Sequence, residues 1–315
     1  MQPLIIIIGP TAVGKSALGV ELALQIQGEI ISGDSVQVYQ KLNIGSAKPS
    51  AEEQKGVPHH LIDFLDPTEP FTVARFQTMT RDLITEIRAR GKTPIIVGGT
   101  GLYIRSILDD YSFPEEGSDL IKNKWLEYAR THGNLQLHGI LAECDPASAQ
   151  KLHPNDTSRI IRALEVYELT GKPLSAQRDY LEKEYSHLDE SILYVGLTAP
   201  RSLLYERINQ RCELMIEAGF IREVSSLLQE GYSPQLKAFQ SIGYRHVVNY
   251  LRGILTFEEM MRLFKRDTRR FAKRQLTWFR RDPRVKWYDI TNIGINRIAN
   301  ELSDTCREIQ SRVQL

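Results

Sequence analysis

The sequence predicts an α/β fold in which a mostly parallel sheet is covered by helices on both faces. Four short apolar runs, at residues 4–8, 29–32, 94–97 and 193–197, are typical of buried parallel strands, and residues 286–290 are expected to form a fifth. Helical patterns lie between these runs, and this alternation is what produces a parallel sheet. A third observation is a glycine-rich motif directly after the first run, where a strand would turn into a helix.

The glycine-rich motif has the phosphate-loop pattern Gly-x-x-x-x-Gly-Lys-Ser, which predicts a P-loop NTPase-like core. Gly9 and Gly14 let the backbone turn so that N–H groups point into one concavity at the start of a helix. Lys15 adds a positive charge, and the Ser16 hydroxyl is a candidate ligand for Mg²⁺. The predicted anion-binding residues of the loop are Gly9, Thr11, Ala12, Val13, Gly14, Lys15 and Ser16. The motif leaves open whether the anion is a nucleoside triphosphate or another diphosphate.

Two helices of the core have clear limits in the sequence. A helical pattern runs over residues 73–90, with Thr72 at its N-cap and Gly91 closing it. The strongest helical pattern lies near the end of the chain, over about residues 257–279.

The core is expected to carry an insert. Between about residues 111 and 190 the segments are charged and helical without a convincing strand, and the sheet pattern resumes at residue 191. The sequence therefore predicts a core made of residues 1–110 and 191–315, and a small all-helical domain of residues 111–190 that can move relative to it.

Length and composition are typical of a globular protein. With 315 residues, 42% of them hydrophobic, the chain can bury a core and carry a second, smaller unit. No apolar stretch approaches the roughly 20 residues that span a bilayer, so no membrane partner is expected. Cys144, Cys212 and Cys306 are far apart and odd in number, which fits a reducing compartment. The pair His59-His60 has no third ligand at metal spacing and is expected to be structural or part of a pocket wall. We expect a cytoplasmic protein, with a monomer as the default.

Positive charge is concentrated near the C-terminus. Residues 262–286 contain eleven Lys or Arg against two acids, a local charge of +9 that leaves −8 on the rest of the chain. A solvated helix face normally mixes both signs, so this segregation favours a polyanionic partner such as nucleic acid. The basic residues are Arg266, Arg269, Arg270, Lys273, Arg274 and Arg280, beside an apolar seam of Phe264, Phe271 and Trp278. Because these aromatics recur every seven residues, we expect them to pack in the core rather than to stack on bases.

Two predicted strands end in residues that can carry chemistry. Asp34 follows the second strand, at the sheet edge where ligands bind in open α/β folds. It can hold Mg²⁺, accept a proton or cap a helix. The run at 94–97 ends in a Gly-Gly-Thr-Gly turn that contains Thr100, where a phosphate-loop ATPase is expected to carry a metal-binding aspartate. Asp63 is a weak substitute because the apolar run before it is short, so the ATPase interpretation is weakened.

Two pairs of arginines are candidate anion-binding groups. Arg207 and Arg211 are four residues apart on one face of a predicted helix, where like charges repel unless an anion lies between them. The planar guanidinium group suits phosphate oxygens, although each arginine can instead point into water or meet an acid such as Glu206. Arg159 and Arg162 lie near the start of a helix in the insert, where their field would cover any channel that the insert closes.

Seven motifs together resemble a known family. They are GPTAVGKS, GDSVQVYQKLNIGSAKP, PHHLIDFLDP, VGGTGLYI, HPNDTSRIIRALEVYELTGKP, QSIGYR and KRQLTWFRRDP. In this order they cover nearly the whole chain, which resembles the bacterial tRNA dimethylallyltransferases, also called isopentenyltransferases. The phosphate loop alone is shared with many kinases, whereas the other motifs are not. Val13 and Ser16 replace the serine and threonine that the family often has, and Ser16 keeps the hydroxyl.

The resemblance implies a reaction and its participants. A dimethylallyl group would pass from dimethylallyl diphosphate to the N6 amine of the adenine immediately 3′ of the anticodon of tRNA, A37, with pyrophosphate leaving. The loop would then hold the pyrophosphate of an isoprenoid rather than ATP, with Mg²⁺ as cofactor at Ser16 and with Arg207 and Arg211 as further diphosphate ligands. The amides of residues 11–16 and Lys15 are expected to stabilise the charge that develops on pyrophosphate.

The resemblance also implies catalytic residues and a tRNA surface. Asp34 would accept the proton of the adenine amine, and Thr100 would contact the target nucleotide or the bridging oxygen. The adenine is expected to flip out of the anticodon loop so that residues 35–37 read its edge. If the insert closes over the loop, the two substrates would enter from opposite sides and water would be excluded. The implied tRNA-binding residues are Asp34, Ser35, Val36, Gln37, Thr100, Ser158, Arg159, Ile160, Ile161, Arg162, Phe239, Gln240, Ser241, Ile242, Gly243, Tyr244, Arg245, Lys273, Arg274, Gln275, Leu276, Thr277, Trp278, Phe279 and Arg280.

Two other functions are compatible with a phosphate loop. A small-molecule kinase, for example one acting on a nucleoside, would consume ATP but gives no reason for the basic helix. A non-catalytic RNA-binding GTPase-like switch would need an Asn-Lys-x-Asp segment after a core strand, and the sequence has none.

Overall fold

The computed structural model describes residues 2–109, 117–178 and 187–312. The chain divides into two compact units, one of residues 1–109 and 187–315 and one of residues 110–186. The first predicted boundary, between residues 110 and 111, lies outside the described residues. At the second boundary the structure assigns His187 and the residues after it to the larger unit, a few residues before the predicted position of 191.

The larger unit contains a six-stranded parallel sheet with the strand order β3-β2-β4-β1-β5-β6. All five predicted strands are confirmed. The strands are β1 (Leu4–Ile8), β2 (Gly28–Gly33), β3 (His59–His60), β4 (Thr93–Gly98), β5 (Ile192–Thr198) and β6 (Lys286–Asp289).

The short edge strand β3 was not expected, because its two histidines are not a strand pattern. It pairs with only one neighbour, at Ile30 and Ile31 of β2. Nε2 of His60 lies 2.7 Å from the carboxylate of Glu29, which also accepts a hydrogen bond from Arg90. His60 therefore has a structural contact, as the sequence suggested. Polar contacts, rather than burial of apolar side chains, keep the edge strand β3 in place.

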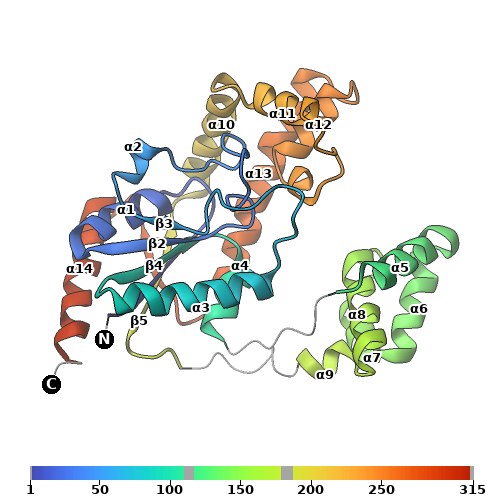
Figure 1. Ribbon diagram of the computed structural model, residues 1–315, viewed down its shortest axis with the longest axis horizontal. Helices are drawn as coiled ribbons and strands as arrows, with labels where there is room; N and C mark the ends of the chain where they lie inside the picture. Colours follow the sequence, from blue (N-terminus) through green and yellow to red (C-terminus); the bar gives the residue numbers. More distant parts are fainter. Residues whose placement is uncertain (1, 110–116, 179–186, 313–315) are drawn as a thin grey trace. The chain divides into compact units, whose positions relative to one another are not determined.

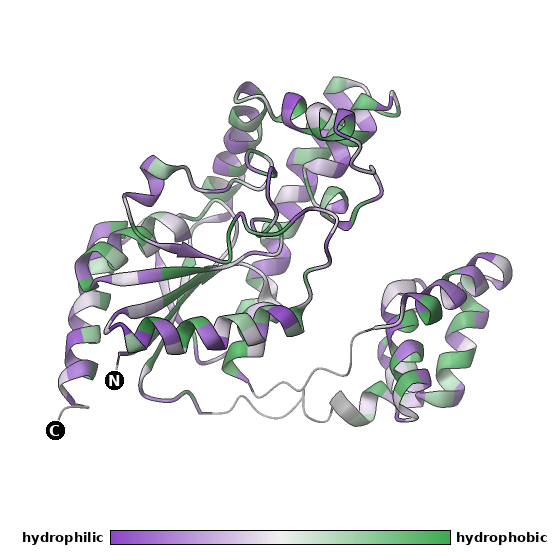
Figure 2. Ribbon diagram, in the orientation of Figure 1, coloured by the Kyte–Doolittle hydropathy of each residue, from purple (hydrophilic) through white to green (hydrophobic). Residues whose placement is uncertain are grey.

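Helices cover both faces of the sheet because the strand residues alternate between two apolar clusters. Ile6 and Ile8 of β1 face the cluster that contains α3 (Val73–Ala89) and α4 (Gly101–Leu108). Ile5 and Ile7 face the cluster that contains α1 (Lys15–Ile26) and α14 (Ile295–Arg312). Both faces are therefore buried, and Figure 2 shows green, hydrophobic segments in the middle of the sheet between helices that carry both green and purple residues.

The helices with the clearest sequence signals form as expected. Thr72 caps α3 by accepting a hydrogen bond from the Arg75 amide, and Gly91 follows the helix at a φ of 71°. Thr256 and Glu259 form a reciprocal capping box at the start of the longest helix, α13 (Phe257–Phe279). These limits are local in origin, which explains why the sequence alone indicated them.

The remaining helices of the larger unit gather beside the sheet (Figure 1). They are α2 (Ala51–Gln54), α10 (Arg201–Glu217), α11 (Phe220–Gln229), the 3₁₀ turn η1 (Lys237–Gln240) and α12 (Tyr244–Leu251). Of these, α10 and α12 pack directly against α13, α11 packs against α10 and α12, η1 packs against α12, and α2 packs against α1. Their buried aromatics include Phe220, Phe239, Tyr244 and Phe264.

The predicted apolar seam of α13 is partly wrong. Phe264 is buried, but Trp278 is 39% exposed and Phe271 is only partly buried. The buried positions of this helix are instead Met260, Phe264, Ala272, Gln275 and Phe279. A straight helix drifts about 20° per seven residues, so over the two repeats Trp278 comes to lie about 40° away from Phe264 around the helix axis, at the margin of the buried face. Trp278 is therefore left at the surface.

The smaller unit is helical throughout its described residues. Its helices are α5 (Asp119–His132), α6 (Asn134–Cys144), α7 (Pro146–Lys151), α8 (Thr157–Thr170) and α9 (Leu174–Arg178). Trp125, Leu137, Leu141, Ile160 and Leu164 form a separate apolar core. Asp145 is buried at the start of α7, where it accepts hydrogen bonds from the Ser148 and Ser175 amides.

No helix in the described parts of the chain is long and apolar enough to cross a membrane.

Candidate functional site

The parallel register brings three predicted site segments to one edge of the sheet. Ile8 of β1 and Gly33 of β2 both lie opposite Gly98 of β4, which stands between them. The phosphate loop, Asp34 and the glycine turn follow these three residues directly. They therefore lie together although they are up to about 90 residues apart in the sequence.

The phosphate loop has the backbone that its glycines permit. Gly9 and Gly14 have φ angles of 148° and 102°, which residues with a side chain rarely adopt. A Cβ atom on Gly9 would also lie 2.6 Å from the Leu197 carbonyl oxygen of β5. Both glycines are thus required by conformation, and the loop leads into α1 at Lys15.

Lys15 lies in the loop with its charge only partly compensated. Its Nζ donates a hydrogen bond of 2.8 Å to the Pro10 carbonyl oxygen. Burial and the nearby positive charge of Arg211 lower the pKa of Lys15 to about 7, while Asp34 acts in the opposite direction. A bound anion would restore the ordinary protonation of this lysine.

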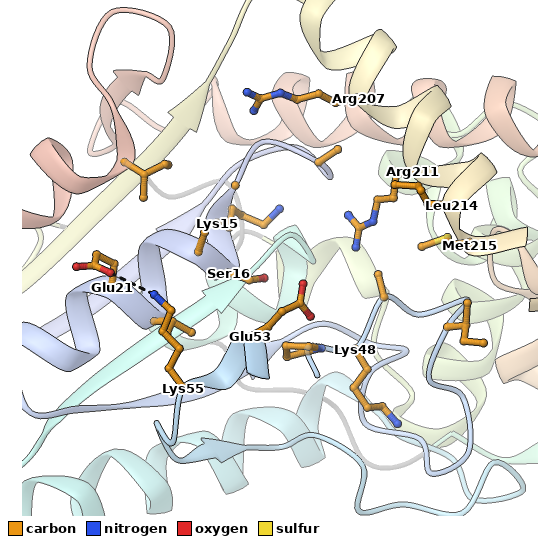
Figure 3. A pocket seen from close by; sticks show the side chains of 18 of the residues that line it. Lys15, Ser16, Glu21, Lys48, Glu53, Lys55, Arg207, Arg211, Leu214 and Met215 are labelled. Atoms are coloured by element: carbon orange, nitrogen blue, oxygen red, sulfur yellow. Dashed lines mark ion pairs between the residues drawn. The ribbon is translucent and has the colours of Figure 1, made fainter. Parts of the chain in front are cut away.

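A cavity of about 880 Å³ opens beside the loop, and we call it the loop cavity. Figure 3 shows Lys15 and Arg211 directed into it from opposite sides. Ser16 also lines it, at the exposed N-terminus of α1. The cavity is lined as well by Arg207, Lys48, Lys55, Glu21, Glu53, Leu214 and Met215. It combines several cations with apolar surface.

Arg207 and Arg211 lie together as their spacing predicted, on the face of α10 that borders the loop cavity. Nη1 of Arg211 donates a hydrogen bond of 3.2 Å to the Thr11 hydroxyl, so this arginine is attached to the loop itself. Arg207 is exposed at the margin of the cavity. Of the two, Arg211 is the better placed to contact an anion held by the loop.

A second cavity, of about 320 Å³, lies on the other side of Arg211, and we call it the aspartate cavity. It is lined by Asp34, Ser35, Val36 and Thr100 from the sheet edge, by Gln240, Ser241 and Ile242, and by Phe271 and Arg274 of α13. Ala47, Arg211 and Met215 line both cavities. The two cavities therefore share a wall beside the phosphate loop.

Asp34 lies half-buried in the turn after β2. Its Oδ1 accepts hydrogen bonds from the Val36 amide at 2.8 Å and from the Gln37 amide at 3.3 Å. Asp34 thus caps a turn rather than a helix, and its carboxylate also borders the aspartate cavity. The structural and the chemical interpretations of this residue are compatible.

Thr100 is the N-cap residue of α4, but its side chain makes no capping hydrogen bond. Thr100 is among the residues that line the aspartate cavity. The glycines around it leave no room for side chains. Added Cβ atoms would lie 2.4 Å from the Gly33 carbonyl oxygen at Gly98, 2.1 Å from Gln275 at Gly99 and 2.2 Å from Trp278 at Gly101. Close packing against the β2 backbone at Gly98, and against two side chains of α13 at Gly99 and Gly101, therefore explains why this turn carries glycines where an ATPase would carry an aspartate.

Gln275 has a role that sequence reasoning missed. Its Oε1 accepts a 2.8 Å hydrogen bond from the Thr11 amide, and its Nε2 donates to the Gly99 carbonyl oxygen at 3.1 Å. This buried side chain connects α13 to both the phosphate loop and the glycine turn. The Thr11 amide is therefore bonded to Gln275, so of the amides of residues 11–16 expected to stabilise the diphosphate it is the one that already has a partner within the protein.

We expect Gln275→Leu to lower the free energy of unfolding by about 2 kcal/mol, because two backbone groups lose their partner. Chemical denaturation measures this effect. Thr277→Ala is the matched control on the same helix, because the Thr277 hydroxyl is exposed and bonds only to the Lys273 carbonyl oxygen in the described structure. Equal stability of the two variants would contradict the role of Gln275.

The residues implied to bind tRNA differ in exposure. Phe239, Gly243, Tyr244, Gln275 and Phe279 are buried in the larger unit, and Ile160 and Ile161 in the smaller one. Ser158, Arg159, Gln240, Lys273, Arg274, Thr277, Trp278 and Arg280 are exposed. The side chain of Gln37 bonds to Ser32 and to the carbonyl oxygens of Ser46 and Ala47. A role in contacting tRNA remains a prediction for all of these residues, and the buried side chains pack inside their own units.

The basic helix is only partly available to a partner. Asp267 accepts hydrogen bonds from Arg245 at 2.7 Å, from Arg266 at 2.8 Å and from His246 at 3.2 Å. Burial opposes ionisation of Asp267, but these bonds outweigh it and hold its pKa below the usual range. Beyond this cluster, Arg270, Lys273, Arg274, Thr277, Trp278 and Arg281 line a surface groove of about 420 Å³, which we call the basic groove.

The two arginines predicted in the insert also have acidic neighbours. Arg162 pairs with the buried Glu165 at 2.6 Å, and Arg159 lies 3.8 Å from Asp156. Arg159 is the more exposed of the two.

Comparison with known proteins assigns this arrangement to a family. Residues 37–282 match the family described as IPP transferase. The chain belongs to the IPP transferase family. This span begins after the phosphate loop and Asp34, but full-length relatives cover those residues as well. A tRNA dimethylallyltransferase of Desulfitobacterium hafniense (strain DSM 10664 / DCB-2) is 61% identical over 100% of both chains. One of Carboxydothermus hydrogenoformans is 54% identical over 96% of both chains.

Solved structures of the family have the same fold. The full-length tRNA isopentenylpyrophosphate transferase of Bacillus halodurans is 40% identical, with a TM-score of 0.72 over 100% of both chains. A eukaryotic dimethylallyltransferase acting on tRNA is 28% identical, with a TM-score of 0.82 over 99% of this chain and 80% of that one. The predicted P-loop NTPase-like α/β fold and the predicted family are both confirmed.

Proposed function

We propose that this IPP transferase transfers a dimethylallyl group from dimethylallyl diphosphate to the N6 amine of A37 in tRNA, releasing diphosphate. The observation that carries the proposal is the pair of cavities that share Arg211 as a wall. One contains the phosphate loop, and the other contains a carboxylate and a hydroxyl at the sheet edge. Two substrates can thus meet beside the loop while each keeps its own site. The relatives named tRNA dimethylallyltransferase support the reaction.

The loop cavity would hold the diphosphate. Breaking the allylic carbon–oxygen bond places negative charge on the leaving diphosphate, which the loop amides, Lys15 and Arg211 are positioned to stabilise. Lys15 would be fully protonated in that complex, because the anion offsets the burial that lowers its pKa.

The donor set also fits Mg²⁺. In the described residues no three Asp, Glu, His or Cys side chains gather around a possible metal. The exposed Ser16 hydroxyl lines the loop cavity and is an oxygen donor of the kind that Mg²⁺ prefers, so it would hold the ion. The ion would supply positive charge to the leaving group.

The aspartate cavity would receive the adenine. The amine lone pair is delocalised into the ring, so a base that accepts a proton as the carbon–nitrogen bond forms lowers the barrier. The Asp34 carboxylate would take that proton. The Thr100 hydroxyl, which makes no helix-capping hydrogen bond, would bond to the nucleotide or to the bridging oxygen. The adenine must leave its stack to enter, which costs less in a loop than in a duplex.

The function is tested with purified protein, Mg²⁺, radiolabelled dimethylallyl diphosphate and unmodified tRNA. Parallel reactions contain labelled ATP, or a tRNA in which A37 is changed to guanine. We expect label to enter only the adenine-bearing tRNA. Consumption of ATP without prenyl transfer would instead establish a kinase.

The basic groove would supply phosphate affinity. We expect Lys273→Ala to weaken tRNA binding and to reduce the slope of log K against log salt concentration by about 1, because one phosphate contact is lost. Filter binding at several salt concentrations measures this slope. Arg307→Ala removes another exposed cation, which lies on α14 beside Asp304, and should leave the slope unchanged. Equal slopes for both variants would place the RNA elsewhere.

A further inference from the structure

One carboxylate outside both cavities is bonded to segments on two sides of the aspartate cavity. Glu223 lies in the first turn of α11, and its Oε2 accepts hydrogen bonds from the Asn43 amide at 3.0 Å and the Ile44 amide at 2.7 Å. Its Oε1 accepts from the Gly45 amide at 3.3 Å and from the Tyr244 hydroxyl at 2.7 Å. Three successive amides converging on one carboxylate are a strong, geometrically specific anchor.

The three amides belong to a loop that separates the two cavities. Residues 42–48, which we call the partition loop, place Asn43, Ile44 and Lys48 on the loop cavity. The same loop places Gly45 and Ser46 on the aspartate cavity, and Ala47 on both. The position of this loop therefore decides how closely the two substrates approach.

The other donor to Glu223 comes from a different wall of the aspartate cavity. Tyr244 lies two residues after Ile242, the last residue of the segment 240–242 that lines this cavity. Its ring is fully buried and packs edge to face against Phe220. Glu223 thus connects the partition loop to the first residue of α12 through a single side chain.

The packing leaves the partition loop little freedom at this point. A Cβ atom on Gly45 would lie 2.1 Å from the Phe220 ring and 2.6 Å from the Tyr244 ring. The Gly45 backbone is therefore pressed against two aromatic rings while its amide is held by Glu223. Small displacements of α11 would move the loop with it.

The loop in turn holds the proposed base. The Gln37 side chain donates to the carbonyl oxygens of Ser46 at 3.3 Å and Ala47 at 3.0 Å. The Gln37 amide donates to Oδ1 of Asp34. Hydrogen bonds from Glu223 to the partition loop, from the partition loop to the Gln37 side chain, and from the Gln37 amide to Asp34 therefore link Glu223 to the Asp34 turn, with covalent backbone between them.

We propose that Glu223 is a positioning residue that sets the separation between the diphosphate and the acceptor adenine by anchoring the partition loop. The inference rests on the proposed function. Glu223 itself lines neither cavity. Glu223 would act on the rate of transfer, because displaced substrates spend less time in the geometry in which they can react. It would not affect the strength of substrate binding to the phosphate loop or to the basic groove.

Glu223→Gln tests the proposal, since an amide keeps the size of the side chain but turns one acceptor oxygen into a donor facing N–H groups. We expect kcat for transfer to fall about tenfold, with the KM for dimethylallyl diphosphate and the Kd for tRNA unchanged. Hydrogen exchange of the amides of residues 43–45 should accelerate while exchange in β1 and β4 stays slow. Glu230→Gln is the control, because Glu230 pairs only with the surface residue Lys41 in the described structure and should change none of these quantities.

An unchanged kcat, or a rise in KM or Kd as large as the fall in kcat, would overturn the proposal. So would unaltered amide exchange at residues 43–45. If Glu223→Gln does not fold, Tyr244→Phe decides on the same readouts, because it removes only the hydroxyl bonded to Glu223 and keeps the ring. We expect a fall in kcat of about twofold to threefold for that variant. Absence of transfer by the unmodified protein would refute the proposed function instead, and the exchange measurement would still report on the anchor.

Discussion

Asp34→Asn is expected to lower kcat for prenyl transfer by about 10²- to 10⁴-fold, the usual contribution of a positioned base. Asn keeps the oxygen that accepts from the Val36 and Gln37 amides, so the turn after β2 should stay intact. It cannot take the proton of the adenine amine. We therefore expect the free energy of unfolding and the Kd for tRNA to remain as in the unmodified protein, measured by denaturation and filter binding.

Asp34→Ala separates the structural role of this residue from its chemical role. It removes the acceptor of the turn as well as the base, so it should lose about 1 kcal/mol of stability in addition to the rate. If Asp34→Asn transferred prenyl groups at the normal rate, Asp34 would be only a turn residue. Another group in the aspartate cavity would then have to accept the proton.

Lys15→Met is expected to lower kcat/KM by about 10²- to 10³-fold, because it removes one preorganised cation from the site of the leaving diphosphate. Steady-state kinetics with saturating tRNA measures the effect. Folding should not suffer. The pKa of Lys15 is lowered from 10.5 to about 7 in the folded chain. At pH values below 7 this lysine is charged in both states, and holding the charge in the folded chain lowers the free energy of unfolding. This penalty disappears as the pH rises through 10.5. The variant should consequently be at least as stable as the unmodified protein at pH 6.

The same lysine predicts a pH dependence of binding. A bound diphosphate raises the pKa of Lys15 above about 7, so affinity is fully present below pH 7 and falls as the pH rises through the pKa of the complex. At pH 8 binding should take up close to one proton per site. Calorimetry in buffers of different ionisation enthalpy measures this uptake, and Lys15→Met should abolish it. Equal uptake by the variant would assign the proton to another group.

Much of the fold could be predicted because its signals are local. Apolar runs of four or five residues mark the central strands. Glycines with positive φ angles mark the turns, and an N-cap threonine and a capping box mark the starts of two helices. The edge strand at His59 and His60 escaped prediction, since its stability comes from pairing with Glu29 and not from a pattern of its own. Trp278 was misassigned because a seven-residue repeat does not keep to one face of a straight helix.

The candidate site was predicted in its residue types but not in its connections. Lys15, Ser16, Asp34 and Thr100 were found because each lies at the end of a strand or in a recognisable motif, and the family resemblance supplied their proposed roles. The separation of two cavities by the partition loop gave no signal in the sequence. Neither did the burial of Phe279, which belongs to a segment implied to contact tRNA.

The sequence by itself determined the parallel α/β sheet, the phosphate loop at its edge, the helical insert and the membership of the IPP transferase family. Only the tertiary structure decided that Gln275 hydrogen-bonds to a loop 264 residues before it, and that Glu223 accepts hydrogen bonds from backbone amides about 180 residues away. The physical reason is that strand and cap signals arise between residues a few positions apart. Hydrogen bonds such as these depend on how distant elements pack, which no local pattern encodes.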